Sequence, residues 1–161
     1  MKRLRTVLAL SAVVAVVMSG VVTTSSATQT TASQRPSAGF RLQSVGSGLC
    51  LDIRAGNPWN GASVAMWSCM DWSSQRWHWN GVQLQSDVNN RCLDVADGNL
   101  ANGGDINMWD CGGQVWSHEG DQTLRIGGKC LDVSAGNNGR GAAVQIWECH
   151  SGAHQRWRVI G

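Results

Sequence analysis

A block of about 40 residues occurs three times in this chain, and this repetition constrains the fold more than any other feature of the sequence. Each block contains Cys-Leu-Asp, has a Trp 15 residues after that Asp and a second Cys two residues later, and then has Gln-x-Trp. The Asp and Trp positions pair as Asp52 with Trp67, Asp94 with Trp109, and Asp132 with Trp147. One supersecondary unit is therefore used three times, at approximately residues 40–81, 82–121 and 122–161.

Short segments of alternating or apolar residues, separated by turn signals, fill each repeat. Asn-Gly pairs at residues 60–61, 80–81, 102–103 and 138–139 mark tight turns. Outside the amino-terminal region the sequence has no sustained helical period. This pattern is typical of strands. We predict an all-β fold with about four short strands in each repeat and about twelve in total.

Alternation along the strands predicts which side chains share a surface. In the segment 144–147, Gln145 and Trp147 face away from the apolar Val and Ile, and the other repeats show the same pattern. In the segment 130–133, Leu and Val should face the core, so that Asp132 and its preceding Cys point outward. We expect an exposed indole and a carboxylate on one outward surface in each repeat. The Trp of each Gln-x-Trp is expected in the core: Trp77, Trp116 and Trp157.

The six cysteines predict a disulfide framework, because the first 27 residues resemble a secretory signal peptide (described below) and disulfides are typical of exported proteins. Many pairings are possible, but the repetition favours the one that treats every repeat alike: Cys50–Cys69, Cys92–Cys111 and Cys130–Cys149. The alternative is a metal site. It is disfavoured because the cysteines lack Cys-x-x-Cys spacing and no His recurs near them in every repeat. We therefore expect neither a metal nor another cofactor.

The first 27 residues have the composition of a secretory signal peptide. Residues 2–5 carry three basic side chains, residues 7–17 are apolar, and residues 25–27 are small enough for a cleavage site after Ala27. The alternative, a transmembrane anchor, is disfavoured because the apolar stretch contains Ser and Gly and falls short of the ~20 residues that a span needs. Residues 28–39, rich in Thr and Ser, are expected to form a linker before a domain at 40–161. We expect a secreted, extracellular protein.

The chemistry of the predicted outward surface suits a sugar. A pyranose has an apolar face that can lie on an indole, and hydroxyls that carboxylates and amides can bind. Covering one indole face removes roughly 80–100 Å² of apolar area from water, which is worth about 2 kcal/mol. A single shallow site of this kind should bind weakly, on the order of millimolar. Three such sites would raise the apparent affinity for a polymer.

The three Cys-Leu-Asp segments, the Trp two residues before a Cys, and the three Gln-x-Trp segments together resemble the ricin-B-type lectin domain. The resemblance extends from about Phe40 to Gly161 and implies a β-trefoil. In that family each repeat binds sugar through the Asp, an amide two residues before a stacking aromatic, that aromatic, and polar residues just before Gln-x-Trp. The Gln of Gln-x-Trp orients the Asp. The resemblance implies that this chain binds carbohydrate.

The repeats retain the family pattern to different degrees. The third is the most complete, with Asp132, Gln145, Trp147, His150, His154 and Gln155. The first has Asp52, Trp67, Ser74 and Gln75, but Ala65 stands at the amide position. The second has Asp94, Asn107, Trp109 and Gln114, but its Gln lies only three positions after its second Cys, compared with six in the other repeats. We predict that the third repeat forms the best site and that the second lacks one wall.

Three classes of function compete. The expected one is a monomeric, calcium-independent lectin whose partner is a galactose-, arabinose- or xylan-type glycan. An enzyme is disfavoured because Asp52, Asp94 and Asp132 are equivalent positions of separate repeats and should lie too far apart for an acid/base pair. A protein-interaction or inhibitor module with vestigial sugar sites is the remaining alternative. A glycan array separates these classes.

Net charge predicts how salt affects binding. Removal of Lys2, Arg3 and Arg5 with the signal peptide would leave 10 basic against 11 acidic residues, and no basic run remains. This charge disfavours nucleic acid or an anionic membrane as a partner. Glycan binding should therefore change little between about 50 and 500 mM salt, as measured by calorimetric titration. A steep loss of affinity with salt would instead indicate a polyanionic partner.

Overall fold

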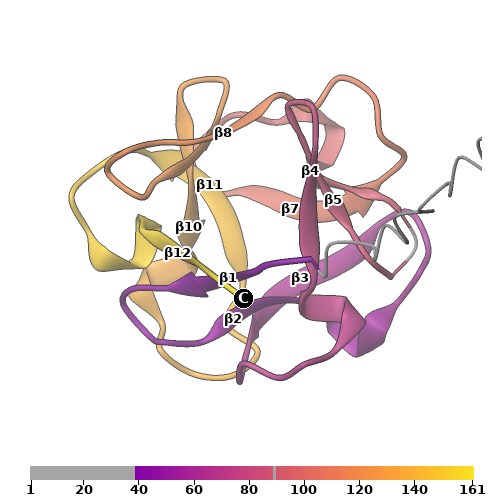
Figure 1. Ribbon diagram of the computed structural model, residues 1–161. Helices are drawn as coiled ribbons and strands as arrows, with labels where there is room; N and C mark the ends of the chain where they lie inside the picture. Colours follow the sequence, from indigo (N-terminus) through magenta and orange to yellow (C-terminus); the bar gives the residue numbers. More distant parts are fainter. Residues whose placement is uncertain (1–38, 89) are drawn as a thin grey trace, which may run out of the picture. The chain divides into compact units, whose positions relative to one another are not determined.

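The computed structural model describes residues 39–88 and 90–161 (Figure 1). The predicted signal peptide (1–27) and residues 28–38 of the predicted linker lie outside the described residues. Within the described ranges, no helix has the length and hydropathy of a transmembrane span.

The described part of the chain contains twelve strands, four in each repeat, which confirms the prediction. The first repeat has β1 (Arg41–Ser44), β2 (Cys50–Ile53), β3 (Ala62–Trp67) and β4 (Trp77–Asn80). The second has β5 (Gln83–Ser86), β6 (Cys92–Val95), β7 (Gly104–Trp109) and β8 (Trp116–His118). The third has β9 (Leu124–Ile126), β10 (Lys129–Val133), β11 (Val144–Glu148) and β12 (Trp157–Ile160). Five single 3-10 turns connect them: η1 (Arg54–Gly56), η2 (Ser73–Gln75), η3 (Ala96–Gly98), η4 (Ser134–Gly136) and η5 (Ala153–Gln155).

The strands pair in the same way in every repeat. The second and third strands form an antiparallel pair: β2 with β3, β6 with β7, and β10 with β11. The register is identical, so that the Asp of Cys-Leu-Asp lies opposite residue 65, 107 or 145. The last strand of one repeat pairs with the first strand of the next: β4 with β5, β8 with β9, and β12 with β1. This threefold arrangement is a β-trefoil (Figure 1).

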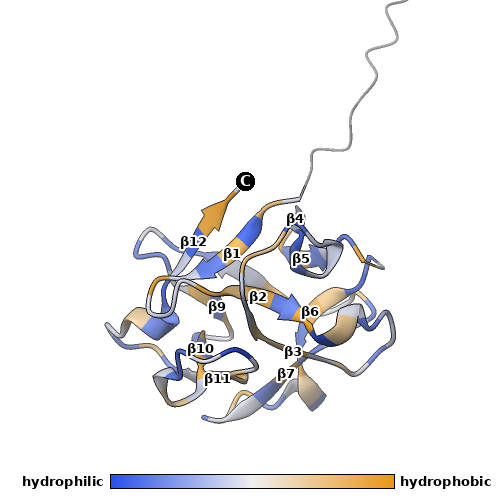
Figure 2. Ribbon diagram, turned by 90° about the horizontal axis from the view of Figure 1, so that it is seen from below, coloured by the Kyte–Doolittle hydropathy of each residue, from blue (hydrophilic) through white to orange (hydrophobic). Residues whose placement is uncertain are grey.

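The core receives the same residue types from every repeat. The Leu of Cys-Leu-Asp is completely buried in every repeat. Trp77 and Trp157 are also completely buried, and Trp116 is 2% exposed. Each of these indole N–H groups donates a hydrogen bond to the carbonyl of that Leu in its own repeat, at 3.3, 2.8 and 3.1 Å. Along β1, Figure 2 shows hydrophilic and hydrophobic residues in alternation, and every second residue of this strand is buried. The predicted core role of these three Trp residues is confirmed.

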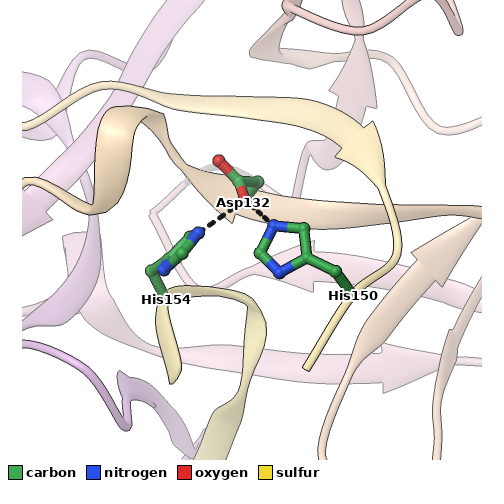
Figure 3. Close-up of side chains that lie close together, drawn as sticks. All are labelled: Asp132, His150 and His154. Atoms are coloured by element: carbon green, nitrogen blue, oxygen red, sulfur yellow. Dashed lines mark ion pairs between the residues drawn. The ribbon is translucent and has the colours of Figure 1, made fainter. Parts of the chain in front are cut away.

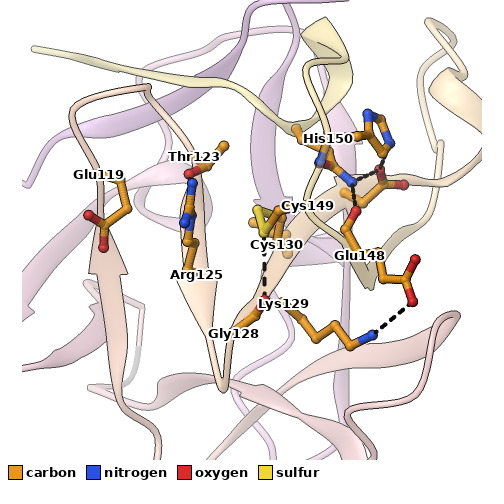
Figure 4. Close-up of a disulfide and its surroundings, with 12 residues drawn as sticks. Glu119, Thr123, Arg125, Gly128, Lys129, Cys130, Glu148, Cys149 and His150 are labelled. Carbon is orange, nitrogen blue, oxygen red and sulfur yellow. Dashed lines mark hydrogen bonds and ion pairs between the residues drawn. A yellow bond between two sulfur atoms is a disulfide. The ribbon is translucent and has the colours of Figure 1, made fainter.

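Three disulfides join the predicted partners, Cys50–Cys69, Cys92–Cys111 and Cys130–Cys149. Each ties its repeat's Cys-Leu-Asp strand to the loop that follows the next strand (Figure 4). In the third repeat this loop carries His150 (Figure 4). The disulfides therefore fix the loop that borders the predicted site to the strand that carries its Asp.

The prediction that the Cys and Asp of Cys-Leu-Asp point outward is wrong with respect to exposure. Asp132 is only 3% exposed and Asp52 only 7%, and the first Cys of every disulfide is completely buried. Their side of the strand does face away from the apolar core, but in the first and third repeats the 3-10 turn that ends at the Gln of Gln-x-Trp packs over it. The Trp two residues before the second Cys of each repeat lies as predicted, with Trp67, Trp109 and Trp147 exposed by 39, 46 and 38%.

Burial predicts different outcomes for two Trp substitutions in the third repeat. Trp157→Ala should leave a cavity in the core and lower the free energy of unfolding by about 3–5 kcal/mol. Trp147→Ala is the matched control, because this indole is partly exposed, and it should lower the stability much less. Chemical denaturation without reductant measures both. Equal losses for the two variants would contradict the assignment of Trp147 to the surface.

Candidate functional site

The third repeat brings its predicted residues together around one carboxylate. Asp132 on β10 lies opposite Gln145 on β11, whose Nε2 donates a hydrogen bond to Asp132 Oδ1 at 3.0 Å. The other oxygen, Oδ2, accepts a hydrogen bond from Gln155 Nε2 at 2.8 Å. A depression of about 300 Å³ lies above this carboxylate. Its lining residues are Asp132, Ser134, Ala135, Gln145, Trp147, His150 and His154.

Gln155 positions more than the carboxylate. It is completely buried, and its Nε2 also donates to the carbonyl of Glu148 at 2.9 Å. Its Oε1 accepts the backbone N–H of His150 at 2.8 Å. One amide therefore joins β10, the end of β11 and the loop after the disulfide. The role that the family resemblance implies for this Gln, orientation of the Asp, agrees with this geometry.

Two histidines border the same depression. The Nε2 atoms of His150 and His154 lie 3.8 and 3.4 Å from Asp132 Oδ2 (Figure 3). The two imidazole rings are 4.9 Å apart between centroids and tilted by 58°. Potential metal-ligand atoms of the three residues all lie within 4.8 Å of one another. The sequence identified both histidines as sugar-site residues but not their convergence with Asp132.

In the first repeat a Gln orients the Asp as in the third repeat, but other side chains surround the carboxylate. Gln75 Nε2 donates to Asp52 Oδ2 at 2.5 Å, and the hydroxyl of Ser74 donates to the same oxygen at 3.5 Å. Ala65 lies opposite Asp52, so that the amide of the third repeat is missing. Burial raises the pKa of Asp52, and the hydrogen bonds from Gln75 and Ser74 offset part of this increase.

The depression of the first repeat is larger and more aromatic. Its volume is about 640 Å³, and both Trp67 and Trp72 line it. Trp72 lies in the loop directly before η2 and is half exposed. Trp59, in another loop of this repeat, is 70% exposed and is not part of this lining.

Among the residues described for the second repeat, the Gln does not hydrogen-bond to the Asp as it does in the other two repeats. Its Gln114 Nε2 donates to the carbonyl of Asp110 at 3.4 Å, and within the described residues it makes no hydrogen bond to Asp94. Asn107 Oδ1 is buried and, in the described part of the chain, has no hydrogen-bond partner. The depression beside Asp94 is lined by Leu100, Val115 and Gly127 among others, but not by Trp109. The short loop before Gln114, noted in the sequence, accounts for the missing wall.

A turn that the sequence analysis did not single out forms one edge of the site. Three residues after each Asp of Cys-Leu-Asp, a residue other than Gly has a positive φ: Ala55, Asp97 and Ala135, at 54, 55 and 55°. Each is followed by a Gly that also has a positive φ. Ala55 and Ala135 line the depressions of the first and third repeats. The recurrent Ala-Gly or Asp-Gly pair at this place was the available sequence signal.

Family comparisons agree with this geometry. The sequence model of the ricin-type beta-trefoil lectin domain matches residues 80–161, and that of the ricin-type beta-trefoil lectin domain-like family matches residues 20–109. The chain belongs to the ricin-type beta-trefoil lectin family. No curated protein sequence gives a significant match.

Solved structures show the same fold as this ricin-type domain. A designed threefold-symmetric protein, ThreeFoil, aligns with a TM-score of 0.69 and 24% identity, over 76% of this chain and 97% of that one. The C-half of an earthworm R-type lectin, in complex with GalNAc, aligns with a TM-score of 0.67 and 20% identity, over 76 and 98% of the two chains. A ricin B-like lectin of Macrolepiota procera, in complex with lactose, aligns with a TM-score of 0.63 and 21% identity, over 75 and 93%.

The different bonding of two equivalent glutamines in this ricin-type domain predicts different stabilities. Gln155→Ala removes hydrogen bonds to a buried carboxylate, a carbonyl and a backbone N–H. It should lower the free energy of unfolding by about 2–3 kcal/mol, since unsatisfied buried polar groups carry most of this cost. Gln114→Ala should cost less because no bond to a carboxylate is lost. Chemical denaturation compares them, and an equal or larger loss for Gln114→Ala would contradict this account.

Proposed function

We propose that this ricin-type lectin-domain protein is a secreted, non-catalytic carbohydrate-binding module whose principal site is in the third repeat. One observation carries the proposal: a partly exposed indole, Trp147, lines the same shallow depression as a buried carboxylate that two glutamines orient. An apolar sugar face can stack on the indole while hydroxyls bond to Asp132. The two histidines offer further polar contacts.

The fixed orientation of the Asp132 carboxylate and its free acceptor capacity support sugar recognition. Gln145 and Gln155 each donate to one oxygen of Asp132, and each oxygen retains acceptor capacity for a hydroxyl. Because the bonds fix its orientation, the carboxylate loses little freedom when a ligand binds. Its charge strengthens the hydrogen bonds that it accepts. The exposed edge of the site remains shallow, which favours one or two sugar units of a longer chain at each site.

The ligand class follows from the same features. A neutral glycan of the galactose, arabinose or xylan type is proposed, bound at the third repeat and more weakly at the first. The first site has two Trp walls but lacks the amide, and the second lacks a polar wall. A glycan array followed by calorimetric titration tests this. A protein partner with no glycan signal on the array would favour the alternative, a protein-interaction module with vestigial sugar sites.

Substitutions rank the three sites. Trp147→Ala should remove the largest share of glycan binding, since it loses about 2 kcal/mol of stacking at the most complete site. Asp132→Asn should also weaken binding, because an amide accepts at only one atom. Trp109→Ala is the matched control and should matter least. Calorimetric titration with the glycan identified on the array measures each variant, and the ranking is inverted if Trp109→Ala binds less than Trp147→Ala.

The raised pKa of Asp52 predicts how the first site responds to acid. In the Trp147→Ala background, glycan binding should decline as the pH falls from neutral through the raised pKa, starting at a higher pH than for an ordinary Asp of pKa 3.8. Protonation removes an acceptor from the site. Because the native pKa lies above the unfolded one, protonation of Asp52 favours the folded state, so unfolding through this group cannot cause the decline. Asp52→Asn should show a flatter pH profile by calorimetric titration, and an unchanged profile would exclude Asp52 as the titrating group.

A further inference from the structure

We propose that Asp132, His150 and His154 form a binding site for one divalent transition-metal ion, of the class to which Zn²⁺ belongs. The inference goes beyond carbohydrate binding and does not depend on it. Imidazole nitrogens and a carboxylate oxygen form a ligand set that suits Zn²⁺, Ni²⁺ and Cu²⁺ rather than Mg²⁺ or Ca²⁺, which prefer oxygen. Three protein ligands would leave one position of a tetrahedral ion open to solvent or to a further ligand.

The distances fit one ion with small adjustments. In a tetrahedral Zn²⁺ site with bonds of about 2.0–2.1 Å, ligand atoms lie about 3.3 Å apart. Here Nε2 of His154 and of His150 lie 3.4 and 3.8 Å from Asp132 Oδ2, and the ligand atoms of all three residues lie within 4.8 Å of one another. Both rings direct an Nε2 atom at the carboxylate (Figure 3). Both distances are longer than that of a normal hydrogen bond and lie in the range of an ion pair, which forms only when the imidazole is protonated.

The surroundings hold two of the three ligands in place. Asp132 is oriented by Gln145 on one oxygen and by Gln155 on the other. Gln155 also accepts the backbone N–H of His150, and His154 precedes it directly in η5. Hydrogen-bonded partners that orient the ligands in this way are typical of metal sites. The Cys130–Cys149 disulfide, adjacent to His150, further restricts the loop.

Metal binding requires one proton to move. The Gly152 N–H donates to His150 Nδ1 at 3.0 Å, so that the neutral ring carries its proton on Nε2. For Nε2 to bind a metal, that nitrogen must lose its proton and Nδ1 must take one, which releases the Gly152 N–H. Since Gly152 is only partly buried, water can accept this N–H instead.

The first and second repeats supply internal comparisons. Both retain the Asp and the Gln, and in both the Gln Oε1 accepts the N–H of the residue after the second Cys, at 2.8 Å. That residue is Met70 in the first repeat and Gly112 in the second, in place of His150. The residue before the Gln is Ser74 or Gly113, in place of His154. The frame is thus common to the domain, whereas the ligand set belongs to the third repeat.

Calorimetric titration and equilibrium dialysis with Zn²⁺ alone test the proposal on the full protein with its disulfides intact. The parent should bind one Zn²⁺ per chain, and Mg²⁺ should not compete. The double substitution His150→Met and His154→Ser gives the third repeat the side chains of the first. It should weaken Zn²⁺ binding by more than the roughly 10- to 100-fold typical for loss of a supporting residue. His78→Ala, at a histidine outside the site, should bind like the parent.

Three outcomes would overturn the proposal: the parent does not bind Zn²⁺, the double variant binds it as well as the parent does, or His78→Ala loses binding. Thermal melts establish that the double variant is folded. Should it not fold, the histidine ring resonances of the parent decide the matter: Zn²⁺ must shift those of His150 and His154 and leave His118 unchanged. Because none of these measurements uses a sugar, failure of the metal site and failure of the lectin function are distinguishable.

Discussion

A buried glutamine amide connects the core of this domain to its candidate binding surface, and both depend on its hydrogen bonds. Gln155 holds Asp132 and the backbone of His150, and two residues later Trp157 fills the core and donates its N–H to Leu131. The same sequence of contacts occurs at Gln75 and Trp77 in the first repeat. A short segment therefore fixes the core packing and the orientation of the carboxylate together. A change that loosens the core packing around Trp157 should therefore also disturb the orientation of Asp132.

The residues that hold the carboxylate and the core recur between repeats, whereas those around the depression vary. The Asp, the Gln, the disulfide and the core Trp recur in all three repeats, whereas the residues that border the depression differ. An alanine replaces the amide in the first repeat, and the loop before Gln114 in the second repeat is three residues shorter than its counterparts. Such changes affect side chains at the rim and leave the core untouched. The domain can therefore carry three unequal sites without three different folds.

Local patterns in the sequence predicted the features that local physics determines. Alternating and apolar segments between turn signals predicted the four strands per repeat, and alternation predicted that Trp147 is exposed. The place of Gln-x-Trp in the strand that ends each repeat predicted that Trp157 is buried. Alternation also identified the side of β10 on which Asp132 lies, but not that η5 covers this side. That covering depends on contacts between segments about 20 residues apart, which a period of two does not encode. The approach of His154 to Asp132 depends on the same turn and was missed for the same reason.

The pairing of β12 with β1 has a consequence for how the chain is connected. Trp157 lies opposite Ser44 in this pair, just as Trp77 lies opposite Ser86 between β4 and β5. Among the three pairings of the last strand of one repeat with the first strand of the next, β4–β5 and β8–β9 are hairpins with a covalent loop, whereas β12–β1 is held by strand pairing. The trefoil is in this sense a closed ring that is cut once. A circular permutant with β12 joined to β1 and new ends in the loop between β4 and β5 would preserve every strand pair, so that the position of the cut is a matter of gene organisation rather than of folding.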